Sequence, residues 1–242
     1  MTKWQLVEVR SIVTGAFERR FRKKRKPIYG SMNKGFTDQE LERFFSVVDN
    51  PKFRLLFIYQ ATLGLRIGEA VRINLNDINF RTRELRISTE KAQVVDYLII
   101  PQFLFNATLE YIKGAKNEIH KAQGYLFFKN EGKSRNPELY LDTNYARKVF
   151  RGYVQKAGID EIYANSGDSR NPVRRKDGKP RRLHRFTTHS LRHTAITRFA
   201  NAVNGNLFQT CHFARHSKPD VTMGYVHQQK EELYRNIEKA FS

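Results

Sequence analysis

The sequence contains a single cysteine, Cys211, and few acidic residues beside its many basic ones. One cysteine cannot form an intrachain disulfide framework or a thiolate zinc cluster, so neither is expected. No run of about eighteen apolar residues occurs, so no membrane-spanning helix is predicted. The N-terminus lacks the apolar segment and small-residue cleavage site of a secretory signal. These absences favour a cytoplasmic location and a protein with no membrane partner.

Basic residues dominate the charge of the chain. Lysine and arginine total 44 against 24 acidic residues, which gives a formal net charge of +20 and a pI near 10.2. This balance is typical of proteins that bind a polyanion. Apolar residues make up 40% of the 242 residues, which is enough for a globular interior in one large or two small domains. A ribosomal or histone-like protein would also be basic, but it would usually have fewer aromatic residues than the 18 Phe and 11 Tyr present here.

Local signals predict an α+β fold that is mainly helical, with a small three-stranded sheet. The sequence Thr37-Asp-Gln-Glu is a capping box that opens one helix, and Asn50-Pro51 opens a second helix that Gly64 can end. Strands are expected at 77–80, 85–89 and 94–100, and further helices at 103–117, 142–157, 187–203, 206–214 and 229–240. Residues 1–36 are expected to form a short helix and a basic linker, and residues 158–186 a mobile basic loop.

A set of polar residues could surround one phosphate with cations and place a phenol against it. The set comprises Arg66 in GLRIGEA, Lys91 before a strand, His189 and Arg192 in HSLRH, and His216 nine positions ahead of Tyr225. Attack by a tyrosine on a phosphodiester leaves a covalent phosphotyrosine that conserves the bond energy. Rejoining therefore needs neither ATP nor a metal, and no cofactor is expected.

The charges of the reaction suggest a role for each of these residues. Phosphodiester cleavage builds negative charge on two non-bridging oxygens, which the planar guanidinium groups of Arg66 and Arg192 can bind bidentately. Tyr225 is the expected nucleophile. The departing 5′ oxygen needs a proton, which Lys91 can supply if neighbouring cations and partial burial lower its pKa.

The remaining polar residues have supporting roles in this interpretation. His189 could accept the phenol proton, and His216 could donate a hydrogen bond to the phosphate. Glu69 lies one helical turn from Arg66 and is expected to orient that arginine or its helix rather than to transfer protons.

Each residue also has a simpler interpretation. Tyr225 alone would more often be a packing residue, and only its position after His216 reverses that preference. Arg66 and Lys91 alone would be a solvated helix-end residue and a turn lysine.

Two histidine pairs could in principle bind zinc. His189 with His193, and His212 with His216, stand at i and i+4, a spacing that can hold zinc on a helix. Arginines rather than carboxylates flank these histidines, and cations repel a metal ion. No metal site is predicted, and His193 and His212 are interpreted as packing residues.

The ordered set resembles the catalytic domain of the tyrosine recombinases, the phage-integrase family of DNA strand-exchange enzymes. The resemblance covers 37–242, and the motifs that carry it are GLRIGE at 64–69, TTHSLRHT at 187–194, and ARHS at 214–217 followed by Tyr225. A lysine on a β-hairpin is also part of the pattern, and Lys91 is the only lysine between Lys52 and Lys113. Arg215 departs from the pattern, because the family usually has glycine there, and this departure puts the turn geometry in question.

The resemblance implies a fold, an activity and partners. It implies a tyrosine-recombinase catalytic domain with an antiparallel sheet, which cleaves and rejoins double-stranded DNA through a 3′-phosphotyrosyl bond on Tyr225. It also implies a homotetramer on DNA, with a monomer as the free form. The expected role is integrase, excisionase or resolvase of a prokaryotic or viral mobile element, at the nucleoid. Two alternatives stay open: relaxation of DNA like a type IB topoisomerase, and a DNA-binding relative that has lost catalysis.

The domain organisation departs from that of full-length recombinases. They carry a core-binding domain ahead of the catalytic domain, whereas here a basic arm is expected at 1–36 and a catalytic domain at 37–242, with the core-binding domain largely absent. Three alternatives stay open: a minimal enzyme, a catalytic fragment whose partner domain lies elsewhere, or an arm and loop that take over part of the DNA clamp. The arm and the basic loop are expected to contact DNA phosphates, although the arm could also be a solvated charge run or a localisation signal. The residues concerned are Arg19, Arg20, Arg22, Lys23, Lys24, Arg25, Arg174, Arg175, Arg181 and Arg182.

Overall fold

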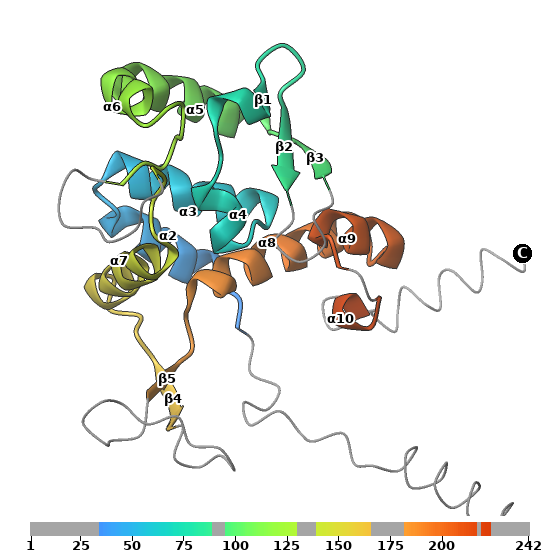
Figure 1. Ribbon diagram of the computed structural model, residues 1–242. Coiled ribbons are helices and arrows are strands. Elements are labelled where there is room, and N and C mark those ends of the chain that lie inside the picture. Colours follow the sequence, from blue (N-terminus) through green and yellow to red (C-terminus); the bar gives the residue numbers. More distant parts are fainter. Residues whose placement is uncertain (1–33, 89–94, 130–138, 166–181, 217–218, 224–242) are drawn as a thin grey trace, which may run out of the picture. The chain divides into compact units, whose positions relative to one another are not determined.

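The computed structural model describes residues 34–88, 95–129, 139–165, 182–216 and 219–223. Over these residues the chain is mainly helical with a small three-stranded antiparallel sheet, which confirms the predicted fold class (Figure 1). No helix within the described ranges is both long and apolar enough to cross a lipid bilayer. The helices are α2 (Asp38–Val47), α3 (Pro51–Leu63), α4 (Ile67–Val71), the short 3-10 helix η1 (Leu75–Asp77), α5 (Gln102–Gly114), α6 (Lys116–Lys121), α7 (Thr143–Lys156), α8 (Thr188–Ala202), α9 (Leu207–Ala214) and α10 (Pro219–Met223).

Helix α2 begins at the predicted capping box. The side-chain oxygen of Thr37 accepts a hydrogen bond from the Glu40 backbone N–H (3.2 Å), and the Thr37 N–H donates one to the Glu40 carboxylate (2.9 Å). These bonds satisfy N–H groups that the start of a helix would otherwise leave unpaired. Leu41 and Phe44 lie on the inner face of the helix and are buried. The prediction for this helix is confirmed.

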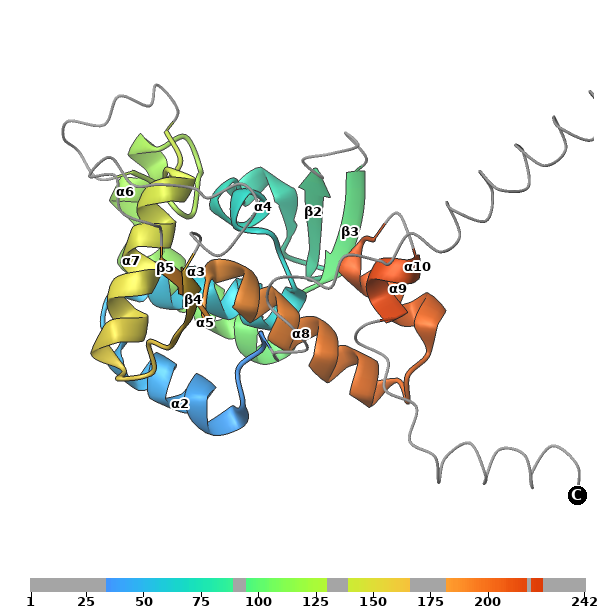
Figure 2. The same cartoon turned by 90° about the horizontal axis from the view of Figure 1, so that it is seen from below.

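Helix α3 has the predicted boundaries, and most of its residues are buried. The Asn50 side chain accepts hydrogen bonds from the first N–H groups of the helix, and Pro51 occupies its first position. Gly64 ends the helix in the left-handed conformation, with φ of +60°, and a side chain added there would meet the ring of Phe213 at 3.4 Å. Helix α3 packs against α8 and α5 (Figure 2). Its C-terminal turn is therefore held close to α8.

The three-stranded sheet has the order β1 (Ile78–Asn79), β2 (Glu84–Ser88), β3 (Val95–Ile99), and both pairs are antiparallel. Each strand lies within one residue of its predicted ends. Leu85 of β2 pairs with Leu98 of β3, and both side chains are buried. Because side chains alternate along a strand, the neighbouring Tyr97 and Ile99 are exposed. One face of the sheet therefore packs on the core.

The helices after the sheet follow the predictions with one difference. Helices α7, α8 and α9 lie within one residue of the predicted ends, whereas the single helix predicted at 103–117 is replaced by α5 and α6. Ala115 separates them with φ of −115° and ψ of 24°, values outside the helical range. Gly114 precedes this break, and glycine is a weak helix former. Helix α4 and η1 were not predicted, and the helix predicted at 229–240 lies outside the described residues.

A second small sheet forms where a loop was predicted. Strands β4 (Ile162–Asn165) and β5 (Arg182–His184) are neighbours in a two-stranded sheet. The prediction of a loop throughout residues 158–186 is therefore wrong at both ends of this stretch. The Gly, Pro and Asn residues of this stretch favour a loop prediction. The pairing of β4 with β5 gives no local signal, because it joins two segments that are distant in sequence. Residues 166–181 lie outside the described ranges.

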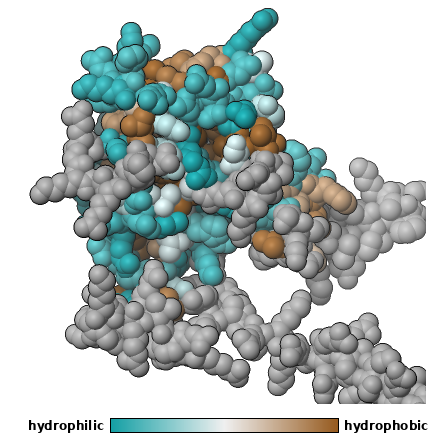
Figure 3. Space-filling model, in the orientation of Figure 1, coloured by the Kyte–Doolittle hydropathy of each residue, from teal (hydrophilic) through white to brown (hydrophobic). Residues whose placement is uncertain are grey.

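Aromatic rings fill much of the core. Phe36 stacks on Phe186 with ring centroids 4.2 Å apart, and Phe44 contacts Phe150 at 5.1 Å. The Phe36 backbone N–H also donates to the side-chain oxygen of Thr194 on α8, at 2.8 Å. The segment before α2 is thereby fixed against α8. The face shown in Figure 3 is mostly hydrophilic over the described residues, as expected for a chain with these rings inside.

Candidate active site

Arg66 lies in the turn between α3 and α4 and is tied to Glu69 by two hydrogen bonds. Its guanidinium Nη1 donates to Glu69 Oε1 at 2.7 Å, and its backbone N–H donates to Glu69 Oε2 at 2.8 Å. The Glu69 side chain is fully buried, whereas that of Arg66 is 24% exposed. Burial alone would raise the pKa of Glu69, but the charge of Arg215 and the hydrogen bonds from Arg66 outweigh it and hold the pKa below its ordinary value. Glu69 is therefore an ionised carboxylate that fixes the Arg66 turn.

Arg192 lies on α8 and joins two segments distant in sequence. Its guanidinium donates through Nη1 to the carbonyl of Gly64 and through Nη2 to the carbonyl of Ala214. These carbonyls belong to the C-terminal ends of α3 and α9, where helix carbonyls lack a partner within the helix. The residue is buried, with 1% of its surface exposed. Arg192 is thus both a predicted phosphate ligand and a structural link, and Arg66 is the more accessible of the two arginines.

His189 and His193 lie one turn apart on α8 with their rings in contact. The ring centroids are 4.8 Å apart and nearly perpendicular. Partial burial, and then the charges of Arg192, Arg66 and Lys34, lower the pKa of His189 to about 4, although part of the residue is exposed. Its imidazole is therefore neutral near pH 7, which is the form that can accept a proton.

His216 follows α9 directly. Its Nδ1 lies 3.0 Å from the side-chain oxygen of Thr222, and its backbone carbonyl accepts from the thiol of Cys211 at 3.2 Å. Burial, followed by the charges of Arg192 and Arg66, lowers the pKa of His216 to about 4. This imidazole is also neutral near pH 7, so it can donate a hydrogen bond through one nitrogen only.

The structure brings four of the predicted site residues together. Arg66 and Arg192 both lower the pKa of both histidines, His189 and His216, and His189 itself contributes to the shift at His216. Helix α8, which carries Arg192 and His189, packs against α3 on one side and α9 on the other (Figure 2). Motifs far apart in sequence therefore converge on one cationic site.

The other predicted site residues fall mostly outside the described ranges. Lys91 and Tyr225 are among them, so their expected roles as acid and nucleophile stay predictions. Arg182 is described and is exposed as the first residue of β5. The expected phosphate-contacting residues that lie outside the described ranges are Arg19, Arg20, Arg22, Lys23, Lys24, Arg25, Arg174, Arg175 and Arg181.

Arg215 is a member of this site that the motif analysis did not assign. It caps α9 in the left-handed conformation, with φ of 53° and ψ of 46°. This backbone conformation is the one that glycine adopts most easily, although arginine occupies the position. Its Nη2 donates to the Gly64 carbonyl at 3.1 Å and to Glu69 Oε2 at 3.2 Å. Its side chain is 3% exposed. The signal in the sequence was the departure itself: a long basic residue at a position where the resemblance implies glycine.

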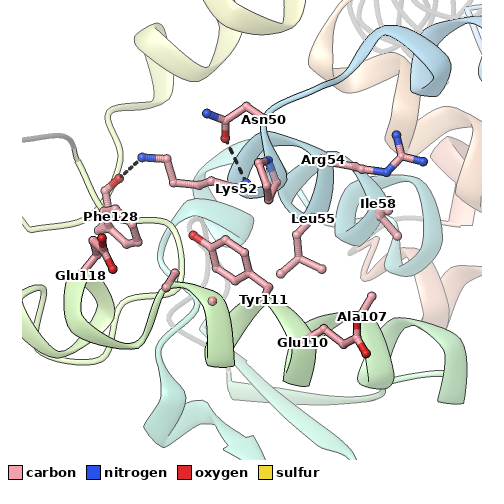
Figure 4. A pocket seen from close by; sticks show the side chains of 13 residues that line it. Asn50, Lys52, Arg54, Leu55, Ile58, Ala107, Glu110, Tyr111, Glu118 and Phe128 are labelled. Atoms are coloured by element: carbon pink, nitrogen blue, oxygen red, sulfur yellow. Dashed lines mark hydrogen bonds between the residues drawn. The ribbon is translucent and has the colours of Figure 1, made fainter.

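A groove of about 710 Å³ lies between α3 and α5, and none of the described site residues lines it (Figure 4). Lys52 borders it, donates through Nζ to the Phe128 carbonyl at 3.0 Å, and has its pKa lowered to about 8 by burial. Tyr111 projects into the same space, with its hydroxyl bonded to the Leu126 carbonyl at 3.0 Å. Over the described part of the chain, no group of three or more His, Cys, Asp or Glu side chains is placed to hold a metal ion.

Comparison with known sequences gives a family and two archaeal relatives. Residues 34–232 match the model of the Phage integrase family. Tyrosine recombinase XerA of Pyrococcus horikoshii is 25% identical over 130 residues, which are 54% of this chain and 43% of the relative. XerA of Pyrococcus furiosus is 24% identical over 131 residues, again 43% of the relative. The match thus spans less than half the length of either relative.

Comparison with solved structures gives the same fold. The crystal structure of XerA recombinase aligns with a TM-score of 0.59 and 18% identity, over 90% of this chain and 65% of that chain. The Tn1549 transposon integrase in complex with transposon right end DNA aligns with a TM-score of 0.62 and 18% identity, over 93% of this chain and 70% of that chain. The catalytic domain of bacteriophage HP1 integrase aligns with a TM-score of 0.51 and 17% identity, over 84% of this chain and 93% of that domain.

Proposed function

Because the chain belongs to the phage integrase family, we propose that it is a site-specific DNA recombinase that cleaves and rejoins double-stranded DNA. The reaction passes through a 3′-phosphotyrosyl bond on Tyr225 and uses neither metal nor ATP. The observation that carries this proposal is that the Arg192 guanidinium donates to the carbonyls of Gly64 and Ala214, which lie two residues before Arg66 and His216. His189 lies on the same helix as Arg192, so residues from three separate parts of the sequence are brought together. Two arginine cations beside two neutral imidazoles suit a reaction that moves a proton and increases the negative charge of a phosphate.

The chemistry follows from the state of each side chain. The phenol oxygen of Tyr225 attacks the phosphorus while His189, neutral near pH 7, accepts the phenol proton. The bond from phosphorus to the 5′ oxygen breaks, and Lys91 supplies the proton to that oxygen. Rejoining reverses these steps, because the phosphotyrosine keeps the energy of the broken bond.

The arginines stabilise the charge that develops on the phosphate. The Arg66 guanidinium is partly exposed and held by Glu69, so it can present its remaining N–H groups to one non-bridging oxygen. Arg192 places a second positive charge beside it, and His216 donates a hydrogen bond. Charge placed in advance needs no reorganisation when the reaction occurs.

Double-stranded DNA is the proposed substrate and partner. The net charge of +20 favours it. Among the solved structures with this fold, XerH is bound to its difH substrate and the Tn1549 integrase to transposon DNA. We propose the basic arm at 1–36 and the predicted arginines between residues 174 and 182 as contacts to DNA phosphates, and residues 37–242 as the catalytic domain. Assembly as a homotetramer on DNA, and action in the cytoplasm on a mobile element, belong to the same proposal.

Trapping of the covalent intermediate tests the proposal. The protein is incubated with nicked suicide duplexes that carry the flanking sequence of the gene's own element, and adducts resistant to SDS are counted. We expect an adduct with the wild-type protein and none with Tyr225→Phe, at closely similar affinity for the duplex. Equal adduct yield from Tyr225→Phe would contradict the nucleophile assignment.

The products of the same assay separate the alternatives. Recombinant or junction products support a recombinase, whereas relaxed circles alone would indicate a topoisomerase-like activity. Tight, salt-sensitive binding without any adduct would indicate a DNA-binding relative that has lost catalysis.

A further inference from the structure

We infer that Arg215 is a positioning residue of the proposed active site: through Glu69 it holds the Arg66 turn and joins it to the segment that carries His216. This inference rests on the proposed function, because it concerns the same cleavage reaction. It adds a residue that the motifs of the family do not contain at this position.

The Glu69 carboxylate is shared between two arginines. Glu69 Oε1 accepts from Arg66 Nη1, and Oε2 accepts from both the Arg66 backbone N–H and Arg215 Nη2. A buried carboxylate with donors on both oxygens has little freedom to rotate. Arg215 therefore fixes the group that in turn fixes Arg66.

Arg215 also links two motifs that are far apart in sequence. Its Nη2 also donates to the Gly64 carbonyl at 3.1 Å, a contact across 151 positions of the sequence. The same carbonyl accepts from Arg192, so two guanidinium groups meet at the C-terminal end of α3. His216 is the next residue after Arg215. A shift of the α3 end would therefore be passed directly to His216.

The backbone of Arg215 is in the left-handed conformation. A residue with a β-carbon is disfavoured at φ of 53°, and glycine would avoid that strain. Arginine is also among the side chains that lose most conformational freedom on burial. The hydrogen bonds of its side chain compensate for these costs, even though Arg215 Nε is buried without an acceptor among the described residues. The side chain, and not the turn, accounts for arginine here.

Arg215 also changes the balance of charge around Glu69. Arg66 and Glu69 alone would sum to zero, whereas Arg66, Glu69 and Arg215 together carry one net positive charge. Loss of the Arg215 guanidinium would leave Glu69 to neutralise Arg66 completely, and the Arg66 backbone N–H would be the remaining donor to Glu69 Oε2. Both changes weaken the stabilisation of a phosphate that gains negative charge in the transition state.

Single-turnover cleavage of the nicked suicide duplex tests this inference. Arg215→Met removes the guanidinium and keeps a long apolar stem, and Arg215→Lys keeps the charge but not the planar fork. We expect the rate constant for adduct formation to fall about tenfold or more in Arg215→Met, since small misplacements at a reacting centre reduce rates by up to about 100-fold. The Kd for the duplex should stay close to that of the wild type. The rate constant of Arg215→Lys should lie between those of Arg215→Met and the wild type.

Arg198→Met is the matched control, because Arg198 is an exposed arginine on α8 that pairs with Asp38 at the surface, and its rate should not change.

A double-mutant cycle with Glu69→Gln separates positioning from a general loss of stability. If Arg215 acts through Glu69, Arg215→Met should reduce the rate much less in the Glu69→Gln background than in the wild type. Reductions that multiply independently would overturn the inference, as would a rate for Arg215→Met equal to that of the wild type. If Arg215→Met fails to fold, Arg215→Lys decides: a rate equal to that of the wild type would make Arg215 purely structural. A wild-type protein that forms no adduct would overturn the proposed function and this inference together, whereas an active wild type with an equally active Arg215→Met would overturn this inference alone.

Discussion

Arg215 in the candidate active site and Lys52 in the groove between α3 and α5 are both buried cations, but they are held differently. Arg215 pairs with a buried carboxylate and with a carbonyl from distant parts of the sequence. Lys52 donates to the Phe128 carbonyl and lies 4.3 Å from the centre of the Phe128 ring. Burial lowers the pKa of both side chains, to about 8 for Lys52, but at Arg215 the Glu69 carboxylate opposes this effect and stabilises the charge. A buried cation alone is thus a weak sign of function, and several cations converging on one shared carboxylate are a much stronger one.

The largest effect should come from Arg192, which belongs to the convergent site. Arg192→Ala removes one of the proposed phosphate ligands and leaves the Gly64 and Ala214 carbonyls without this donor. We expect the rate of adduct formation to fall by about 10²–10³-fold, as on removal of a donor that stabilises transition-state charge. The measurement is single-turnover cleavage, normalised to the folded fraction from circular dichroism.

Lys52→Met, in the groove between α3 and α5, is the matched control, and its cleavage rate should equal that of the wild type. An Arg192→Ala protein that is folded and cleaves at the wild-type rate would contradict the comparison, as would a large loss of activity in Lys52→Met.

The free energy of unfolding of Glu69→Gln should distinguish the candidate active site from the groove at Lys52. Removal of one partner of a buried ion pair typically costs about 3–5 kcal/mol, and a loss of this size is expected near pH 7. The pKa of Glu69 is lower in the folded state than its ordinary value, so its contribution is present above that ordinary value and is lost as the pH falls through the folded pKa. The difference in unfolding free energy between wild type and Glu69→Gln should therefore shrink on acidification. Urea unfolding at a series of pH values measures it, and a difference that is constant down to strongly acidic pH would argue against an ionised Glu69.

A smaller effect is expected in the dependence of the cleavage rate on pH, on its acid side. The pKa values of His189 and His216 are both lowered to about 4, so both rings stay neutral at pH 5.5. We expect the midpoint of the acid limb to lie nearer 4 than the ordinary histidine value of about 6.5. The free energy of unfolding should fall as the pH is lowered from about 6.5 to about 4, because the histidines of the unfolded chain bind protons in this range and those of the folded chain do not. Rates corrected for the folded fraction give the midpoint, and a value near 6.5 would contradict the electrostatic picture of the site.

The smallest effect is expected for the stability of Lys52→Met. Replacement of a buried charge by an apolar side chain of similar length is often neutral or stabilising. We expect the thermal midpoint at pH 7 to stay equal or to rise by about a few degrees. Because the pKa of Lys52 is lower in the folded state, the wild type should gain stability relative to this variant as the pH rises above 8. Thermal melts at pH 7 and above 8 test both points, and a clear loss of stability at pH 7 would mean that the ammonium group is strongly stabilising.

Local signals predicted most of the fold because each acts within a few residues. The capping box at Thr37, the helix start at Asn50-Pro51 and the left-handed end at Gly64 are all confirmed. The pairing of β4 with β5 was missed because it depends on segments distant in sequence, and the break at Ala115 was missed although Gly114, a weak helix former, precedes it.

The sequence by itself determined the order and spacing of the site motifs, the helices that carry them and the excess of positive charge, because these follow from residue type and short-range geometry. Only the tertiary structure decided that Arg192 is buried between the ends of α3 and α9, and that Arg215 reaches Glu69 across 146 positions. The physical reason is that a hydrogen bond or ion pair forms by distance in space, and folding brings together side chains that no local pattern connects.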